Sequence, residues 1–167
     1  LQEGLLLVHN TLVGVNLRHR VQIGAAAKVI TAFDIARMMA LGADWCNAGR
    51  GFMMALGCIQ ALTCHTGHCP TGVTTQDARR QKALVVPDKG TRVANFHRST
   101  MHALKELVQA AGLQHPGQIT AHHIVRRTND SQVHQLANTV LRVEPGALLG
   151  PLDEQHNVFK MYWGRAS

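Results

Sequence analysis

Three of the four cysteines fall in one short stretch, and they limit what this part of the chain can be. Cys58, Cys64 and Cys69 are separated by five and then four residues, and Pro70 follows the last of them. A disulfide framework normally spreads its cysteines through a small secreted domain. A tight cluster instead favours a metal site in a reducing compartment, so we expect a cytoplasmic protein.

The chemistry of this cluster has three readings. Three thiolates on a looping segment suit an iron–sulfur cluster with three iron and four sulfur atoms, whereas a four-iron cluster would also need Cys46. Structural zinc is the alternative, with His65 or His68 as the fourth ligand, although the short CxxC spacing of zinc knuckles is absent. The cysteines could also be small buried residues. Spacing alone leaves all three readings open.

The part of the chain before the cysteines alternates between helical and strand patterns. We expect a helix through 5–13, a strand at 21–23 that ends at 24–27, a helix over 31–41, a strand at 44–48 and a helix over 52–57. Thr31 and Asp34 form a start that resembles a capping box. This order is typical of a parallel α/β unit, either a barrel or a doubly wound sheet.

Beyond Cys69 the chain changes character. Residues 70–82 are polar and irregular, and Pro87 and Asp88 predict the start of a long helix that Asp88 caps and Gly112 ends. One face of this helix is apolar and is expected to pack in a core: Val93, Phe96, Thr100, Leu104, Leu107 and Ala111. Two shorter helical segments are expected near 120–125 and 131–141.

Charge and hydropathy argue against two classes of partner. The net charge is +7, but the basic residues are scattered and only 4% of residues are aromatic. A single-stranded nucleic acid would need a stacking platform, so nucleic-acid binding is not expected. The longest apolar stretch, 52–62, is too short to cross a bilayer, and this segment therefore has no predicted membrane span.

Several motifs in the same order resemble one enzyme family. The run from Gly57 to Gln76 resembles the glutamate synthase large-subunit signature, with both cysteine spacings preserved. Forms of A-D-W-C-N, R-G-F and V-V-P-D-K, which occur in FMN-binding glutamate-synthase-like proteins, stand here at 43–47, 50–52 and 85–89. The resemblance covers roughly residues 1–127 and is specific, because the motifs agree in both order and spacing.

The resemblance implies a fold and a domain organisation. The expected fold is α/β: the carboxy-terminal part of a TIM-type (β/α)8 barrel, with its last two strands, followed by a cysteine-cluster loop and a mostly helical tail. Residues 1–57 would be the end of the FMN-binding barrel, 58–86 the cysteine loop and 87–167 a helical extension. We expect the chain to be a piece of a longer enzyme and to be inactive alone.

The resemblance also implies a cofactor site. Both expected strands end in small, glycine-containing loops, where backbone amides and a following helix favour phosphate. The FMN-binding residues implied are Gly24, Ala25, Lys28, Asn47, Gly49 and Arg50. Ala27 departs from the family, which usually has glycine there, so its methyl group is expected either to restrict the backbone of the first loop or to crowd the phosphate.

The implied activity is that of an oxidoreductase. FMN and an iron–sulfur cluster on Cys58, Cys64 and Cys69, most simply 3Fe-4S, would serve the reduction of 2-oxoglutarate and glutamine-derived ammonia to L-glutamate. Ferredoxin or a reductase subunit would donate electrons. The alternatives are an FMN-barrel oxidoreductase with a different amine or carbonyl substrate and a zinc-stabilised interaction module. No acid–base catalyst is assigned from this segment.

Overall fold

The computed structural model describes residues 1–165 and has an α/β fold in which helices predominate. The chain divides into two compact units. The first unit contains Leu1–Ala25, Arg37–Cys46 and the segment from Gly117 onward, and the second contains Ala26–Ala36 and Asn47–Pro116. The predicted roles of regions 1–57, 58–86 and 87–167 stay predictions.

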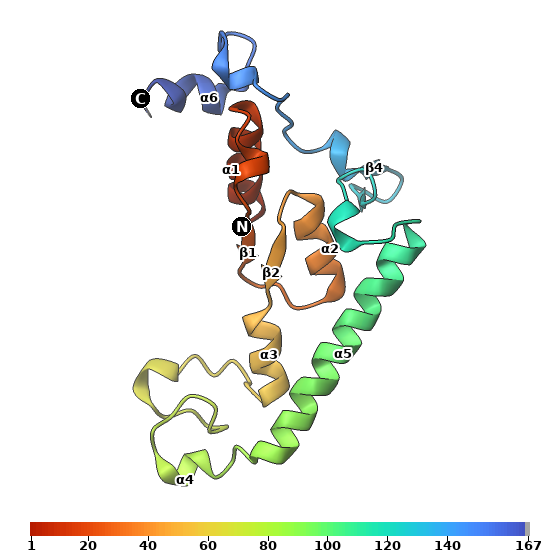
Figure 1. The fold of residues 1–167 in the computed structure, drawn as a ribbon. Coiled ribbons are helices and arrows are strands. Elements are labelled where there is room, and N and C mark those ends of the chain that lie inside the picture. Colours follow the sequence, from red (N-terminus) through yellow and green to blue (C-terminus); the bar gives the residue numbers. More distant parts are fainter. Residues whose placement is uncertain (166–167) are drawn as a thin grey trace. The chain divides into compact units, whose positions relative to one another are not determined.

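Figure 1 labels the α-helices and most of the strands along the chain. Up to the first cysteine of the cluster the elements are α1 (Gln2–Gly14), η1 (Arg18–Arg20), β1 (Gly24–Ala26), α2 (Ala32–Ala40), β2 (Trp45–Asn47) and α3 (Gly49–Leu56). The middle of the chain holds η2 (Cys64–Thr66), α4 (Ala78–Gln81), α5 (Val86–Ala110) and η3 (Pro116–Gln118). The last part holds β3 (Val125–Arg127), β4 (Val133–Gln135), η4 (Leu136–Asn138), η5 (Ala147–Leu149), α6 (Asn157–Tyr162) and η6 (Trp163–Arg165).

Local signals placed the first helices and the second strand well. At the start of α2, the Asp34 amide donates to Thr31 Oγ1 at 3.1 Å, and the Thr31 amide donates to Asp34 Oδ2 at 2.9 Å. These reciprocal bonds confirm the expected capping-box-like start, because each side chain satisfies an amide that lacks a helical partner. The strand expected at 44–48 is β2.

The first strand lies three residues later than the pattern predicted. The expected strand was 21–23, whereas β1 is Gly24–Ala26 and pairs with β2 in a two-stranded sheet. Ile23 comes just before the strand: its amide donates to Asp44 Oδ2 at 2.6 Å and its carbonyl accepts from the Asp44 amide at 2.8 Å. A side chain at Gly24 would come 2.6 Å from the Trp45 ring. Glycine at position 24 leaves room for the Trp45 ring on the neighbouring strand, which a larger residue would not.

The first unit has its own apolar core. Val143, Leu148 and Phe159 are buried together, and neighbouring half-buried side chains pack against them. Gly14, in the last turn of α1, lies so close that a Cβ atom there would meet Leu148 Cγ at 2.5 Å. The core therefore ties the amino-terminal helix to the carboxy-terminal segment of this unit.

An arginine joins several segments of the first unit. Arg18 donates to Asp44 Oδ2 at 2.8 Å, to His9 Nδ1 at 3.1 Å and to the carbonyls of Val21 and Gly42. Burial raises the pKa of Asp44, but the hydrogen bonds from Arg18 and the Ile23 amide outweigh it and hold the pKa below its usual value. Burial and the charge of Arg18 lower the pKa of His9, so this ring favours its neutral form.

The second unit is built on the contact between α3 and α5, which lie beside each other in Figure 1. Phe52 and Phe96 meet edge to face with their centroids 5.3 Å apart. Gly51 is buried in α3. The Phe96 ring packs so closely against it that a Cβ atom at this position would come within 2.7 Å of the ring. On α5, Leu104 is buried as expected, whereas Ala111, placed on the same face by the pattern, is exposed.

Two expectations for the helical part were wrong. The long helix begins at Val86, so Asp88 lies in its first turn and does not cap it, while Pro87 occupies a position at the helix start that proline favours. No helix forms at 120–125, and the one expected at 131–141 is reduced to the single turn η4; an antiparallel hairpin in which Arg126 is opposite His134 forms instead. Hydrogen bonds between the two strands stabilise this region as a hairpin. The spacing of its apolar residues, which is helical, gives no information about such pairing.

Within residues 1–165, no helix combines the length and apolar character needed to cross a membrane.

Candidate functional site

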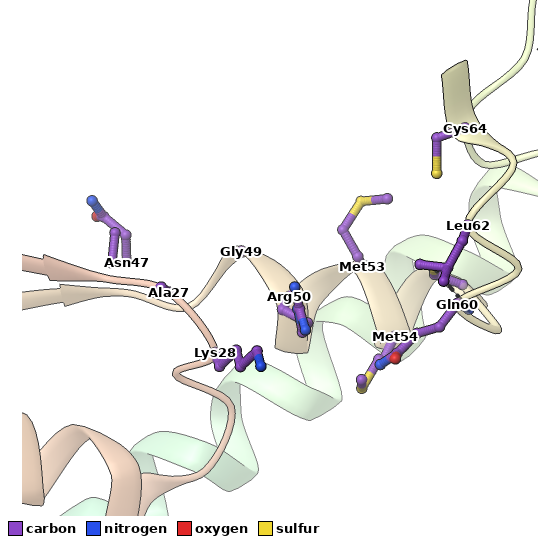
Figure 2. Close-up of a pocket in the computed structure, with 12 residues that line it drawn as sticks. Ala27, Lys28, Asn47, Gly49, Arg50, Met53, Met54, Gln60, Leu62 and Cys64 are labelled. Carbon is purple, nitrogen blue, oxygen red and sulfur yellow. Dashed lines mark hydrogen bonds between the residues drawn. The ribbon is translucent and has the colours of Figure 1, made fainter. Parts of the chain in front are cut away.

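A cavity of about 500 Å³ in the second unit contains most of the predicted cofactor-binding residues; we call it the main cavity. Figure 2 shows Lys28 and Arg50 on the side of the cavity toward the strands, and Leu62 and Cys64 on the opposite side. The full lining is Ala26, Ala27, Lys28, Asn47, Gly49, Arg50, Met53, Met54, Cys58, Gln60, Leu62 and Cys64. Residues from the loops after both strands and from the cysteine segment thus share one cavity.

Four of the six residues predicted to bind FMN line this cavity, namely Lys28, Asn47, Gly49 and Arg50. The other two do not. Ala25 is only 1% exposed, and the Trp45 ring fills the space beside Gly24. Of the two that do not line the cavity, Ala25 is buried, whereas Gly24 is exposed but lies outside the lining.

The cationic end of the main cavity has unsatisfied donors. Lys28 and Arg50 are exposed, and within residues 1–165 neither side chain makes an ion pair or a hydrogen bond. Gly49 begins α3, and its N-cap residue, Ala48, has no side chain that can cap the first amides. Free helix-terminal amides beside two cations suit an anion such as a phosphate.

The first loop is strained where the sequence departs from the family pattern. Ala27 has φ 130° and Lys28 has φ 55°. A φ near 130° is common only for glycine, and a residue with a Cβ atom held there costs on the order of 1–3 kcal/mol. The backbone at Ala27 therefore has a conformation that suits glycine and is strained by the alanine methyl group.

All three clustered cysteines line a second, much smaller cavity of about 10 Å³, which we call the cysteine cavity. Cys58 and Cys64 line the main cavity as well, so the two cavities share a wall. Within residues 1–165, no three His, Cys, Asp or Glu side chains are close enough together to hold a metal ion. The cysteines therefore surround one small space without converging on a single point.

Hydrogen-bond donors surround two of the three sulfurs. The Gln60 amide donates to Cys58 Sγ at 3.4 Å, and the Thr71 hydroxyl lies 3.5 Å from Cys69 Sγ. This hydroxyl contact, together with backbone amides of Thr74 and Thr71, lowers the pKa of Cys69 to about 6. Cys69 is also buried, with 8% of its surface exposed. Its surroundings therefore favour a thiolate, the form that binds metals.

One more polar atom by the cysteine cavity lacks a partner. Thr74 Oγ1 is enclosed and makes no hydrogen bond within the described chain. This hydroxyl lies near Cys69 Sγ and is one of the groups that lower the pKa of that thiol. Three sulfurs around one space, amides aimed at two of them and this hydroxyl together fit a thiolate-bound inorganic group in donor chemistry.

The other candidate ligands lie apart from this set. Cys46, on β2, lines neither cavity, and burial raises the pKa of its thiol. His65 and His68, the fourth ligands considered for zinc, are exposed and do not line the cysteine cavity. The described geometry therefore gives no added support to a Cys3His arrangement.

Four side chains that line the main cavity were not predicted from the sequence: Met53, Met54, Gln60 and Leu62. Met53 and Met54 lie three and four residues after Arg50 on α3, a spacing that puts them on the same helical face. This spacing was a usable signal. No such signal exists for Gln60 and Leu62. Their backbone is left-handed, with φ 57° and 59°, and residue spacing does not predict this conformation.

The chain is similar to known proteins over most of its length. Residues 1–114 match the family model described as the conserved region in glutamate synthase. The glutamate synthase large subunit-like protein YerD of Bacillus subtilis is 39% identical over 140 residues, which is 84% of this chain. The large chain of an Azospirillum brasilense glutamate synthase [NADPH] is 30% identical over 87% of it. Ferredoxin-dependent glutamate synthase 2 of Synechocystis is 35% identical over 75% of it.

These relatives are much longer than the match. The chain covers 27% of the Bacillus protein, 10% of the Azospirillum protein and 8% of the Synechocystis protein. The matched region includes the main cavity, the cysteine cavity and the contact between α3 and α5. On the strength of the family match and these identities, the chain belongs to the glutamate synthase family.

Proposed function

We propose that this chain is the carboxy-terminal part of an FMN- and iron–sulfur-dependent glutamate synthase, with β1 and β2 as the last two strands of a TIM-type barrel. The observation that carries the proposal is the wall shared by the main cavity and the cysteine cavity. Cys58 and Cys64 line both. Redox groups placed in adjoining cavities would be near enough to exchange electrons.

The main cavity suits FMN in its distribution of charge and apolar surface. Lys28, Arg50 and the free amides at Gly49 would hold the phosphate, since they are the unpaired donors at one end. Met53 and Leu62 add apolar surface toward the cysteine end, which suits an aromatic ring system. The remaining contacts to the ring and the substrate would come from barrel strands outside this chain.

The cysteine cavity suits an iron–sulfur cluster of the three-iron type. Cys58, Cys64 and Cys69 supply the three thiolates such a cluster needs, and amides already donate to two of the sulfurs. When bound, the cluster and FMN would supply electron transfer and hydride delivery for the reduction of 2-oxoglutarate and glutamine-derived ammonia to L-glutamate. The chain's own residues would position these groups and neutralise the phosphate.

The electron donor is expected to be a separate protein or subunit. The printed names of the relatives include NADPH-dependent and ferredoxin-dependent enzymes. We propose a donor of one of these two kinds. Oxidation of bound, reduced FMN on addition of 2-oxoglutarate with glutamine or ammonia would identify the substrate without knowledge of the donor.

The test is the cofactor content of the complete protein, purified without oxygen. We expect about three iron atoms and four acid-labile sulfides per chain, together with FMN. Serine in place of Cys58, Cys64 or Cys69 should remove iron and sulfide together, while Cys46→Ser, a change outside both cavities, should leave them in place. One zinc ion with no sulfide would overturn the electron-transfer role and support a structural metal site.

A further inference from the structure

The short helix α4 is held against the turn that contains Cys69. The Arg80 side chain donates to the His68 carbonyl at 3.4 Å. The Gln81 side chain donates to the Thr75 carbonyl at 3.0 Å, so the helix is bonded to the chain both before and after Cys69. These contacts place α4 beside a residue that we propose as a cluster ligand.

Backbone packing also brings α4 close to this turn. Gly72 is buried and has φ 75°, and a Cβ atom there would clash with the Arg80 carbonyl oxygen. The Gly72 amide donates to the Cys69 carbonyl at 3.4 Å. Glycine suits this position both for its backbone conformation and for the close approach of α4. A protein bound on α4 would therefore lie close to Cys69.

Two further cations belong to α4 and its C-cap; we call Arg79 and Lys82 the α4 cations. Both side chains are exposed, and within residues 1–165 neither makes a hydrogen bond or an ion pair. Asp77 is the one acidic residue in the sequence from 58 to 87. Its carboxylate accepts from two α4 amides and pairs with Arg80 at 3.6 Å. No carboxylate of this segment is therefore left to neutralise the α4 cations.

A cationic surface next to a proposed redox site suits one kind of partner. Exposed cations are hydrated in the free protein and contribute little to folding. They attract an acidic protein across about a Debye length, roughly 10 Å at 0.1 M salt, and so speed its association. Complexes between electron-transfer proteins are small, and charge complementarity directs them. The α4 cations fit such a contact better than a permanent subunit interface, which is larger and more apolar.

We propose that the α4 cations form a docking surface for an acidic one-electron carrier protein. The inference rests on the proposed function and selects one of its two kinds of donor, the separate carrier of the ferredoxin type. The reduced carrier would give up one electron and leave oxidised, and the cluster on Cys58, Cys64 and Cys69 would gain that electron. Arg80 and Gln81 serve to hold α4 in place.

Charge reversal tests this surface through binding, which requires no turnover. The double variant Arg79→Glu, Lys82→Glu should bind oxidised plant-type ferredoxin, an acidic carrier, about tenfold more weakly than wild type at low salt. Isothermal titration calorimetry of the complete protein measures the affinity, and added salt should reduce the difference. The matched control, Arg98→Glu with Lys105→Glu, makes the same charge change at exposed positions of α5 and should bind as wild type does.

The second readout is electron delivery. After rapid mixing with reduced ferredoxin, the cluster should be reduced more slowly in the α4 double variant than in wild type. Photoreduction by deazaflavin, a small reductant that needs no docking surface, should proceed equally in both proteins. This pair of measurements separates a weakened docking contact from a damaged cluster.

Three results would overturn the docking surface and leave the proposed function standing. They are a wild-type affinity in the α4 double variant, an equal loss of affinity in the α5 control, and a failure of ferredoxin to bind wild-type protein of normal iron and sulfide content. Wild-type protein without iron and sulfide would overturn the proposed function and, with it, this inference.

Discussion

Two sets of cationic side chains, one in each compact unit, differ in the partners they have. In the first unit, Arg18 is fully engaged by partners from the unit itself, including His9 and Asp44. In the second unit, Lys28 and Arg50 line an open cavity and have no partner among residues 1–165.

The difference separates stability from function. Polar groups that find partners inside a unit tie its segments together, and removing them weakens the fold. Exposed donors around a cavity are hydrated in the free protein and stay available to an anionic ligand. If this distinction holds, substitutions in the first unit should change the stability of the fold, and substitutions around the main cavity should change the binding of a ligand.

The largest effect is expected in the core of the first unit. Leu148→Ala removes a side chain that is 3% exposed and should lower the free energy of unfolding by about 3 kcal/mol, since it leaves a cavity. Urea denaturation of the complete protein measures this. Leu149→Ala is the matched control, because its side chain is 67% exposed, and it should have little effect. Equal losses for the two variants would contradict this core.

The next effect concerns the cationic end of the main cavity. Arg50→Gln should weaken FMN binding about tenfold, roughly 1.4 kcal/mol, by removing one charge-assisted contact. Fluorescence titration of the apoprotein with FMN measures the affinity. Arg79→Gln, at an exposed position outside the cavity, should leave the affinity unchanged. An unaltered affinity in Arg50→Gln would show that the phosphate lies elsewhere.

Glycine at position 27 should relieve the backbone strain in the loop after β1. Ala27→Gly should raise the free energy of unfolding by about 1 kcal/mol, because it relieves the strain of φ 130°. Thermal unfolding of both proteins, with and without FMN, measures the change. Ala26→Gly, one residue earlier in a strand with ordinary φ, should instead destabilise by about 0.5–1 kcal/mol. Destabilisation by Ala27→Gly would mean that the loop tolerates its methyl group.

The smallest effect is a loss of stability in acid. His9 has a lowered pKa in the folded protein, so the neutral ring contributes stability that is present above its unfolded value of 6.5. That stability is lost as pH falls through the lower folded pKa, where protonation would oppose the Arg18 charge. Urea denaturation from pH 7.5 to 5 should show a decline that His9→Gln reduces. His102→Gln, on the exposed surface of α5, serves as the control.

Local chemistry was predictable from the sequence. Thr31 and Asp34 are three residues apart, so their reciprocal bonds form within one helical turn and need no distant partner. The glycine at 49 and the cation at 50 were also foreseeable, because loops between strands and helices commonly bind anions. The structure brings both residues to one cavity with Lys28, while their role toward FMN stays a prediction.

Features that depend on strand pairing, on close packing or on backbone turns were not predictable. The hairpin of β3 and β4 formed where helices were expected, because pairing between Arg126 and His134 is invisible to a pattern read along one segment. The strand at Gly24 depends on the Trp45 ring, and the entry of Gln60 into the main cavity depends on a left-handed turn. None of these has a signal in residue spacing.

The sequence by itself determined the family, the cysteine spacing, the start of α2 and the chemical character of the loops, since these depend on residues close together along the chain. The tertiary structure decided which donors face a shared space. Cys58 and Cys64 line two cavities at once, whereas Cys46 lines neither. The physical reason is that convergence depends on backbone turns and on packing between α3 and α5, which join residues far apart in the sequence.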